Sequence, residues 1–130
     1  MIHFDNWKKE YSELVQKITN LFKPHEVAII SIGALRFRSD QKQKMRERFP
    51  STSLINQAET FISDEGKFKY DLRIRNQMFR HVVEEFKKHS SEWNTFLCME
   101  NSESWIQTYE AMPAKKPELR EYFKPIQINA

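Results

Sequence analysis

The segment SDEGKFKYDLRIR, residues 63–75, places a cation beside an aromatic ring at Lys69 and Tyr70, directly after a glycine turn at Gly66. A lysine ammonium can bind a phosphate group, and an aromatic face can stack on an exposed base for about 1 to 3 kcal/mol. This pairing is typical of a nucleic-acid contact. A structural role is equally compatible with the residues: Tyr70 then closes the core at the end of a hairpin, and Lys69 is only solvated.

Basic residues gather in two segments, although the formal net charge of the whole chain is only +3. Residues 36–48 and residues 67–80 each carry a net charge of +4, so the remainder is net acidic. Segregated positive charge favours a polyanionic partner, because neutralised phosphates release counterions, but a solvated basic face explains it too. The candidate DNA-binding residues are Arg36, Lys67, Lys69, Tyr70, Arg73 and Arg80.

Length and composition restrict the class of protein. The 130 residues fit one domain, which we place at residues 1–111, and three of the five prolines fall in a surface tail over residues 112–130. No apolar run approaches the roughly 18 residues of a membrane span, and no secretory signal is visible. We therefore expect a cytoplasmic protein without a membrane partner. The only cysteine, Cys98, and four histidines without ligand spacing predict no metal site.

Apolar periodicity and turn residues predict the elements of the chain. We predict helices over residues 7–22, 40–49, 72–89 and 102–109, and strands over residues 27–32, 54–62, 67–70 and 95–100. Side chains that can cap the helices precede each of them: Asp5 or Asn6, Ser39 or Asp40, Asp71, and Asn101 or Ser102. On the third helix, Arg73 and Arg80 share a face, where they can contact phosphate or pair with Glu84.

Strands that alternate with helices, together with one hairpin at residues 60–70, predict an α/β fold. Its small, mostly parallel sheet would have helices beside it. Parallel sheets usually have more strands and helices on both faces. The chain therefore looks like part of a larger unit.

Six motifs follow one another along the chain: MIHFDNWKKEY, IISIGALRF, MRERFP, DEGKFKY, MFRHVVEEF and FLCMENSESW. Their order and spacing resemble the C-terminal portion of spore photoproduct lyase-like proteins, a radical S-adenosylmethionine family sometimes labelled DNA photolyase. The similarity extends from Met1 to about Trp105. It implies the last part of a partial TIM barrel plus a C-terminal extension, with MIHF as the remnant of one barrel strand and residues 27–32 as the last.

The resemblance implies a DNA repair lyase in which a [4Fe-4S] cluster cleaves S-adenosylmethionine to a radical. The cluster is held there by a C-x-x-x-C-x-x-C loop, and three thiolates are needed. Cys98 is the only cysteine of this chain, and we expect it to be a packed thiol. We therefore predict no catalytic residue and no cofactor in this chain, which should be inactive alone; both cofactors would belong to a complete family protein.

The resemblance also assigns roles to individual positions. Lys69 and Tyr70 match the basic residue and the aromatic that lie beside damaged DNA in that family. Lysine replaces the arginine common there, which makes the grip on phosphate less directional. Ser31 and Gly33 match the place where backbone approaches the cofactor of a complete enzyme, although a simple turn also explains Gly33.

Three functions remain open from the sequence. The chain could be the DNA-lesion-contacting segment of a repair enzyme, present as a fragment, as a truncated gene product or as one half of a split enzyme. It could be a stand-alone nucleic-acid-binding module that keeps the basic surface without the chemistry. It could also be a structural remnant that self-associates through an open sheet edge near MIHF.

Overall fold

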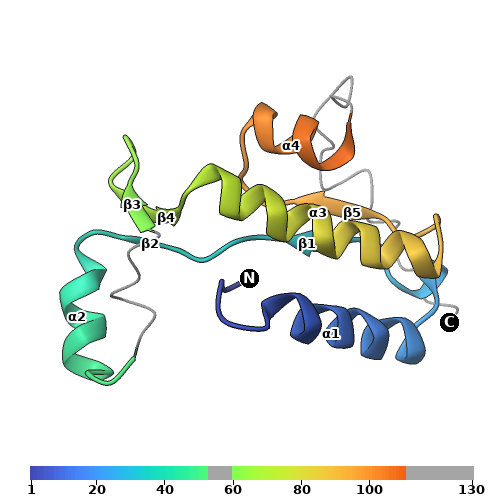
Figure 1. The fold of residues 1–130 in the computed structure, drawn as a ribbon, viewed down its shortest axis with the longest axis horizontal. Coiled ribbons are helices and arrows are strands. Elements are labelled where there is room, and N and C mark those ends of the chain that lie inside the picture. The colour runs from blue at the N-terminus through green and yellow to red at the C-terminus, as the bar shows by residue number, and fades with distance from the viewer. Residues whose placement is uncertain (53–59, 111–130) are drawn as a thin grey trace, which may run out of the picture.

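The computed structural model describes residues 1–52 and 60–110 (Figure 1). Most of the predicted strand over residues 54–62 and the predicted tail over residues 112–130 lie outside these residues. The described elements, in chain order, are α1 (Trp7–Leu21), the 3-10 helix η1 (Pro24–Glu26), β1 (Ile30–Ile32), β2 (Arg36–Arg38), α2 (Gln41–Arg48), β3 (Thr60–Ile62), β4 (Lys67–Tyr70), α3 (Leu72–His89), β5 (Thr95–Leu97) and α4 (Ser102–Tyr109).

The strands form two separate sheets. β1 pairs with β5 in parallel, whereas β4 pairs antiparallel with both β2 and β3. The α/β class is therefore confirmed, and the predicted hairpin is the β3–β4 pair. β1 lies within the strand predicted over residues 27–32, whereas β2 was not predicted as a strand and belongs to the other sheet. Between them the chain turns to the N-terminal segment, where the Leu35 N–H donates to the carbonyl of Met1 at 2.7 Å.

The helices lie close to their predicted positions, but only two of their expected caps form. The Asp71 carboxylate accepts from the N–H groups of Arg73 and Ile74 at 2.8 and 3.2 Å, and Asn101 caps α4. The caps predicted at Asn6 and Asp40 are wrong, since neither side chain accepts a capping hydrogen bond. Asn6 is left-handed at φ 64°, and Asp40 pairs instead with Arg38 at 3.0 Å.

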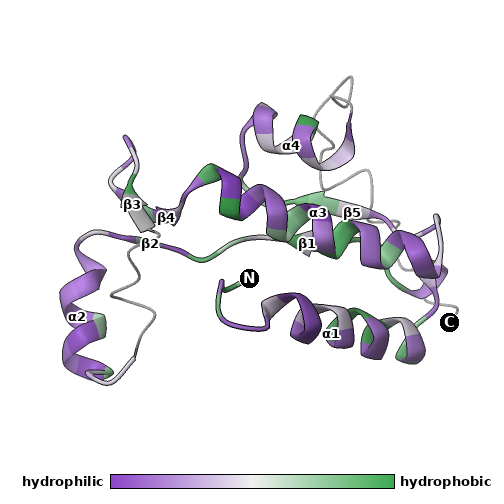
Figure 2. Ribbon diagram, in the orientation of Figure 1, coloured by the Kyte–Doolittle hydropathy of each residue, from purple (hydrophilic) through white to green (hydrophobic). Residues whose placement is uncertain are grey.

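The main core lies between the parallel sheet and a layer of helices. Figure 1 shows α1 and α4 on either side of α3, with β1 and β5 behind them. Its buried side chains are Val15, Ile32, Phe79, Val82, Val83, Phe86, Trp93, Leu97 and Trp105. The hydropathy colouring in Figure 2 contrasts α3, which carries green positions, with the nearly uniform purple of α2, in which no residue is buried. α2 therefore contributes little to this core.

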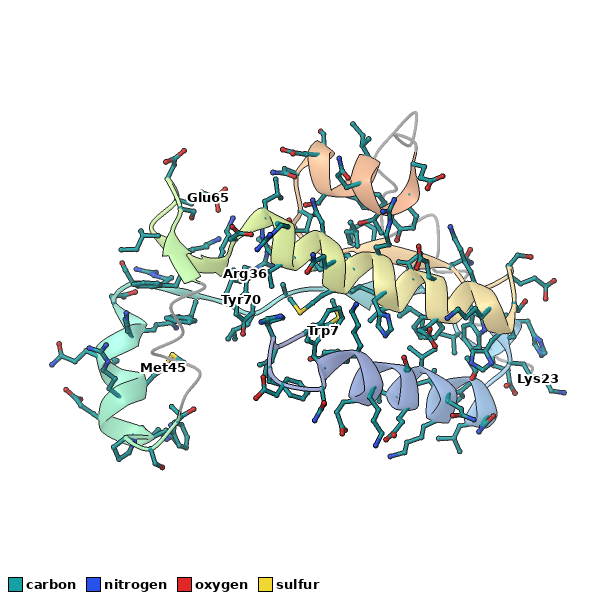
Figure 3. All side chains as sticks on the ribbon, viewed as in Figure 1. Trp7, Lys23, Arg36, Met45, Glu65 and Tyr70 are labelled. Atoms are coloured by element: carbon teal, nitrogen blue, oxygen red, sulfur yellow. The ribbon has the colours of Figure 1, made fainter. Side chains whose placement is uncertain are left out.

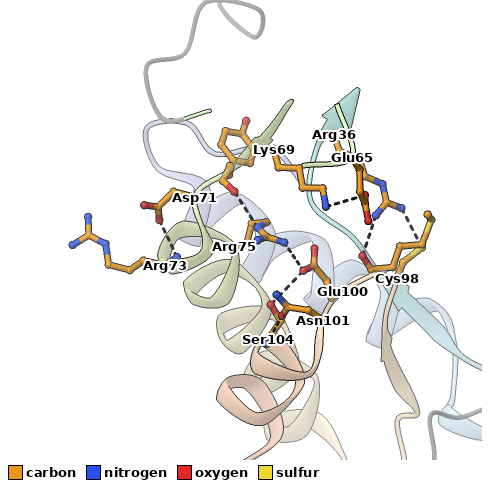
Figure 4. Close-up of polar contacts among 12 residues, drawn as sticks. Arg36, Glu65, Lys69, Asp71, Arg73, Arg75, Cys98, Glu100, Asn101 and Ser104 are labelled. Carbon is orange, nitrogen blue, oxygen red and sulfur yellow. Dashed lines mark hydrogen bonds and ion pairs between the residues drawn. The ribbon is translucent and has the colours of Figure 1, made fainter. Parts of the chain in front are cut away.

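A buried ion pair joins the start of α3 to the turn that precedes α4. Arg75 donates to the Glu100 carboxylate at 2.5 Å and to the main-chain carbonyl of Tyr70 at 3.0 Å (Figure 4). The Ser104 hydroxyl donates to the same carboxylate oxygen at 3.3 Å. Arg75, which contributes to the positive charge of residues 67–80, is thus inside the protein and offers no charge to a partner.

Replacing Arg75 by Met should lower the free energy of unfolding by about 3 to 5 kcal/mol, because Glu100 is then a buried charge without its cation. The double variant Arg75→Met with Glu100→Leu should recover most of that loss, since both charges leave the interior. Urea unfolding followed by circular dichroism measures both values. A double variant as unstable as Arg75→Met would show that the loss comes from packing and not from the uncompensated charge.

Replacing Asp71 by Ala should lower the free energy of unfolding by about 1 kcal/mol, because two N–H groups of the first turn of α3 lose their acceptor. Asp40→Ala is the matched control at the start of α2. Among the described residues its carboxylate forms an exposed ion pair with Arg38 and no capping hydrogen bond, so we expect a change of less than about 0.5 kcal/mol. Equal losses in thermal unfolding of the two variants would contradict the capping role of Asp71.

Candidate nucleic-acid interface

Four basic side chains lie on one face of the antiparallel sheet. In the register of β2 and β4, Arg36 is opposite Lys69 and Arg38 is opposite Lys67. Residues that face each other across antiparallel strands point to the same side of the sheet. We call Arg36, Arg38, Lys67 and Lys69 the basic sheet face.

The intervening residues point to the other side of the sheet. Phe37 and Phe68 stack there with ring centroids 5.2 Å apart. The Lys42 ammonium of α2 lies 4.3 Å from the Phe68 ring centroid. Aromatic packing thus fixes the strands from behind and presents the cations on the opposite face.

The two cross-strand pairs place like charges opposite each other, which destabilises a sheet. Two carboxylates offset part of this repulsion. Asp40 pairs with Arg38 at 3.0 Å, and Glu65, in the hairpin turn, lies 3.8 Å from the Lys67 ammonium and 3.5 Å from that of Lys69. Glu65 is exposed at the tip of the hairpin (Figure 3). An anionic ligand could therefore displace the Glu65 carboxylate and bind both lysines in its place.

Arg36 holds a fixed position at the inner end of the basic sheet face. Its guanidinium donates to the main-chain carbonyl of Met99 at 3.3 Å and lies 3.8 Å from the Cys98 sulfur (Figure 4). Cys98 is only partly buried, and its thiol therefore sits beside a cation at the end of β5 rather than deep in the core. These contacts orient Arg36, so less conformational entropy is lost when it binds an anion.

Tyr70 does not lie on this face. Its side chain is fully buried, at 0% exposure, and packs with Trp7 and Met78 in a second, smaller core. Its hydroxyl oxygen accepts a hydrogen bond from the His3 N–H at 3.1 Å. A ring in this position has no free face for a base, so the stacking role predicted for Tyr70 is corrected to a structural one.

Arg73 and Arg80 lie in a different place. Together with Asn76, Gln77 and Gln107 they line a cleft of about 510 Å³ between α3 and α4. Arg80 pairs with Glu84 at 3.8 Å, as predicted, and with Glu110 at 3.5 Å, so its charge is offset. Figure 4 shows Arg73 pointing away from Lys69 and Arg36. The candidate set is therefore divided between two sites.

Two residues in or beside the basic sheet face were not among the predicted DNA-binding residues. Arg38 lies two positions after Arg36, and in a strand this spacing puts both side chains on one face. That signal was present in the sequence. No sequence signal pointed to Glu65, because its contact with both lysines depends on the geometry of the hairpin turn.

Ser31 and Gly33 lie on β1 and just after it, beside an apolar groove of about 200 Å³ that Leu14 and Ile18 also line. The carbonyl of Gly33 already accepts a hydrogen bond from the Met1 amine. A Cβ at Gly33 would lie 3.6 Å from that of Cys98, an ordinary contact, so no close approach requires glycine here. This apolar groove does not fit the polar S-adenosylmethionine, and the roles predicted for Ser31 and Gly33 remain predictions about a complete enzyme.

Within residues 1–52 and 60–110, no three histidine, cysteine or acidic side chains are grouped as a metal site would need. No helix in these ranges has the length and apolar character to cross a membrane.

Comparisons with protein-family models, with curated proteins and with solved structures found no match to this chain. The resemblance to spore photoproduct lyase-like proteins therefore stays a prediction, supported only by the order of its motifs.

Replacing Tyr70 by Phe should lower the free energy of unfolding by about 1 kcal/mol, because the partly buried His3 N–H loses the hydroxyl that accepts from it. Affinity for single-stranded DNA should not change, since the ring lies inside the protein. Urea unfolding and fluorescence anisotropy with a labelled oligonucleotide measure the two quantities. Unchanged stability combined with weaker binding would return Tyr70 to the set of DNA contacts.

Proposed function

We propose that the protein binds DNA through the basic sheet face. The observation that carries this proposal is the pair of like-charged cross-strand contacts, Arg36 with Lys69 and Arg38 with Lys67. Each pair costs folding free energy, and a phosphate chain lying across the strands would turn this repulsion into attraction. A merely solvated basic face would not need the cations in two opposed rows.

The strength of such binding depends strongly on salt. Neutralising Z phosphates on a single strand gives a slope of log K against log salt of roughly −0.7Z, so four contacts give about −3. The Lys69 side chain is 17% exposed, whereas that of Arg38, although it pairs with Asp40, is 70% exposed. Arg38 and Lys67, at the outer end of the face, are therefore the cations that a long DNA strand reaches first.

The resemblance to spore photoproduct lyase-like proteins supports damaged DNA as the form to be tested first. In this proposal the chain is the lesion-contacting segment of a repair protein. A separate polypeptide with a C-x-x-x-C-x-x-C loop would then supply the cluster and S-adenosylmethionine, because Cys98 is the only cysteine here. The stand-alone module differs in one measurable respect: it binds damaged and intact strands equally well.

Replacing Arg38 and Lys67 by Gln should weaken binding to a single-stranded oligonucleotide and reduce the steepness of its salt dependence by about 1.4, since two phosphate contacts are lost. Fluorescence anisotropy between about 50 and 200 mM salt measures the slope. Lys9→Gln with Lys17→Gln is the matched control, because it removes the same charge from exposed positions of α1.

Removing a negative charge beside the basic sheet face tests the same site, because this change should strengthen DNA binding. Glu65→Gln should strengthen binding several-fold, because Lys67 and Lys69 lose the carboxylate that competes with phosphate. Glu13→Gln removes an equivalent exposed charge that pairs with Lys9 on α1. If both acidic variants gain equally, or if the Arg38 and Lys67 variant matches its lysine control, net charge alone explains binding and the basic sheet face is not the site.

A further inference from the structure

The helix α2 carries positive charge that is separate from the basic sheet face. Its sequence, QKQKMRER, has four basic residues and one acidic residue, which gives a net charge of +3. None of its 8 residues is buried, and Asp40 provides no side-chain cap. So short a helix is marginally stable without packing, because forming its first turn is unfavourable. The core of the protein thus does little to stabilise α2.

The cations Lys44 and Arg48 lie on the side of α2 that faces away from the antiparallel sheet. Lys42 marks the opposite side, since its ammonium lies over the Phe68 ring and successive helix residues are about 100° apart. Both cations are exposed, and like charges four positions apart destabilise a helix. The one acid of α2, Glu47, bonds instead to the Gln43 amide at 3.0 Å. A phosphate that contacts both cations would turn their repulsion into attraction.

An exposed aromatic ring follows these cations directly. Phe49 is 57% exposed at the C-terminal end of α2, and the guanidinium carbon of Arg48 lies 5.6 Å from its ring centroid. Single-strand-binding sites combine these two groups: the cation contacts the backbone, and the ring stacks on a base. The hairpin offers no such ring, because Tyr70 is buried. The end of α2 therefore has the chemistry that Tyr70 does not supply.

The position of α2 favours a single strand over a duplex. The helix begins beside the outer end of the basic sheet face, where Asp40 pairs with Arg38, but Lys42 packs on the aromatic side of the sheet. Figure 1 shows α2 extending from the end of β2, away from the layer of helices. A flexible single strand can turn around this corner. A duplex bends little over lengths below about 150 base pairs, and its stacked bases present no free face to a ring.

We propose that α2 and Phe49 form a second contact for the same DNA, and that this DNA is single-stranded. Lys44 and Arg48 contact phosphates in this complex, and Phe49 stacks on a base. The strand then continues onto the outer end of the basic sheet face. The inference rests on the proposed DNA binding and adds to it the form of the DNA and a further element that holds it.

Replacing Phe49 by Leu keeps an apolar side chain but removes the ring. The affinity for a labelled oligonucleotide of about 16 thymidines should fall about fivefold, which is the effect of losing one weakly stacked base. The affinity for a duplex of the same length should not change. Phe22→Leu is the matched control, because Phe22 is 48% exposed at the corresponding end of α1, and both affinities should persist.

Replacing Lys44 and Arg48 by Gln should reduce the steepness of the salt dependence for the same oligonucleotide by about 1.4, since two phosphate contacts are lost. The control is again Lys9→Gln with Lys17→Gln, which removes the same charge from α1 and should leave the slope unchanged. Fluorescence anisotropy measures the affinities and slopes, and circular dichroism checks that each variant is folded.

The inference requires both losses. Single-strand binding that either Phe49→Leu or the Lys44 and Arg48 variant leaves unchanged would overturn it, and so would an equal loss of duplex binding in Phe49→Leu. The basic sheet face is judged separately by the Arg38 and Lys67 variant. If that variant weakens binding while the α2 variants do not, only the role of α2 fails; if it has no effect, the basic sheet face fails instead.

Discussion

The arrangement of this protein depends on the buried pair formed by Arg75 and Glu100. Three parts of the chain meet there, because Arg75 opens α3, Glu100 precedes α4, and the carbonyl of Tyr70 at the end of β4 accepts from the same guanidinium. Taking two charges out of water is costly, and the pair is stable only while each charge is fully matched by its partner and by further hydrogen bonds. That requirement sets the position of the antiparallel sheet relative to the parallel one.

The proposed binding face benefits from this anchoring. β4 ends at Tyr70, whose burial beside Trp7 and Met78 fixes the inner end of the strand. The stacked rings of Phe37 and Phe68 hold the other side of the sheet. Binding energy at such a face goes into contacts with the ligand rather than into ordering the strands, because the backbone is already in place.

Arg75 therefore has a structural role in the interior, whereas other arginines contribute positive charge at the surface. Arg75 and Arg73 are two residues apart, yet Arg75 is 6% exposed and Arg73 lies in the open cleft between α3 and α4. Net charge along the chain does not distinguish these two situations. Only a buried carboxylate opposite the side chain identifies the structural cation.

Amphipathic periodicity determined α1, α3 and α4, and the turn at Gly66, which is left-handed at φ 71°, determined the hairpin. These features are local, since they depend on residues within a few positions of each other. The pairing of β2 with β4, the burial of Tyr70 and the contacts of Glu65 with both lysines were decided by the tertiary structure. Each of these depends on a partner far away in the sequence or on the geometry of a folded turn, such as His3 for Tyr70, and no local pattern specifies which distant partner packs there.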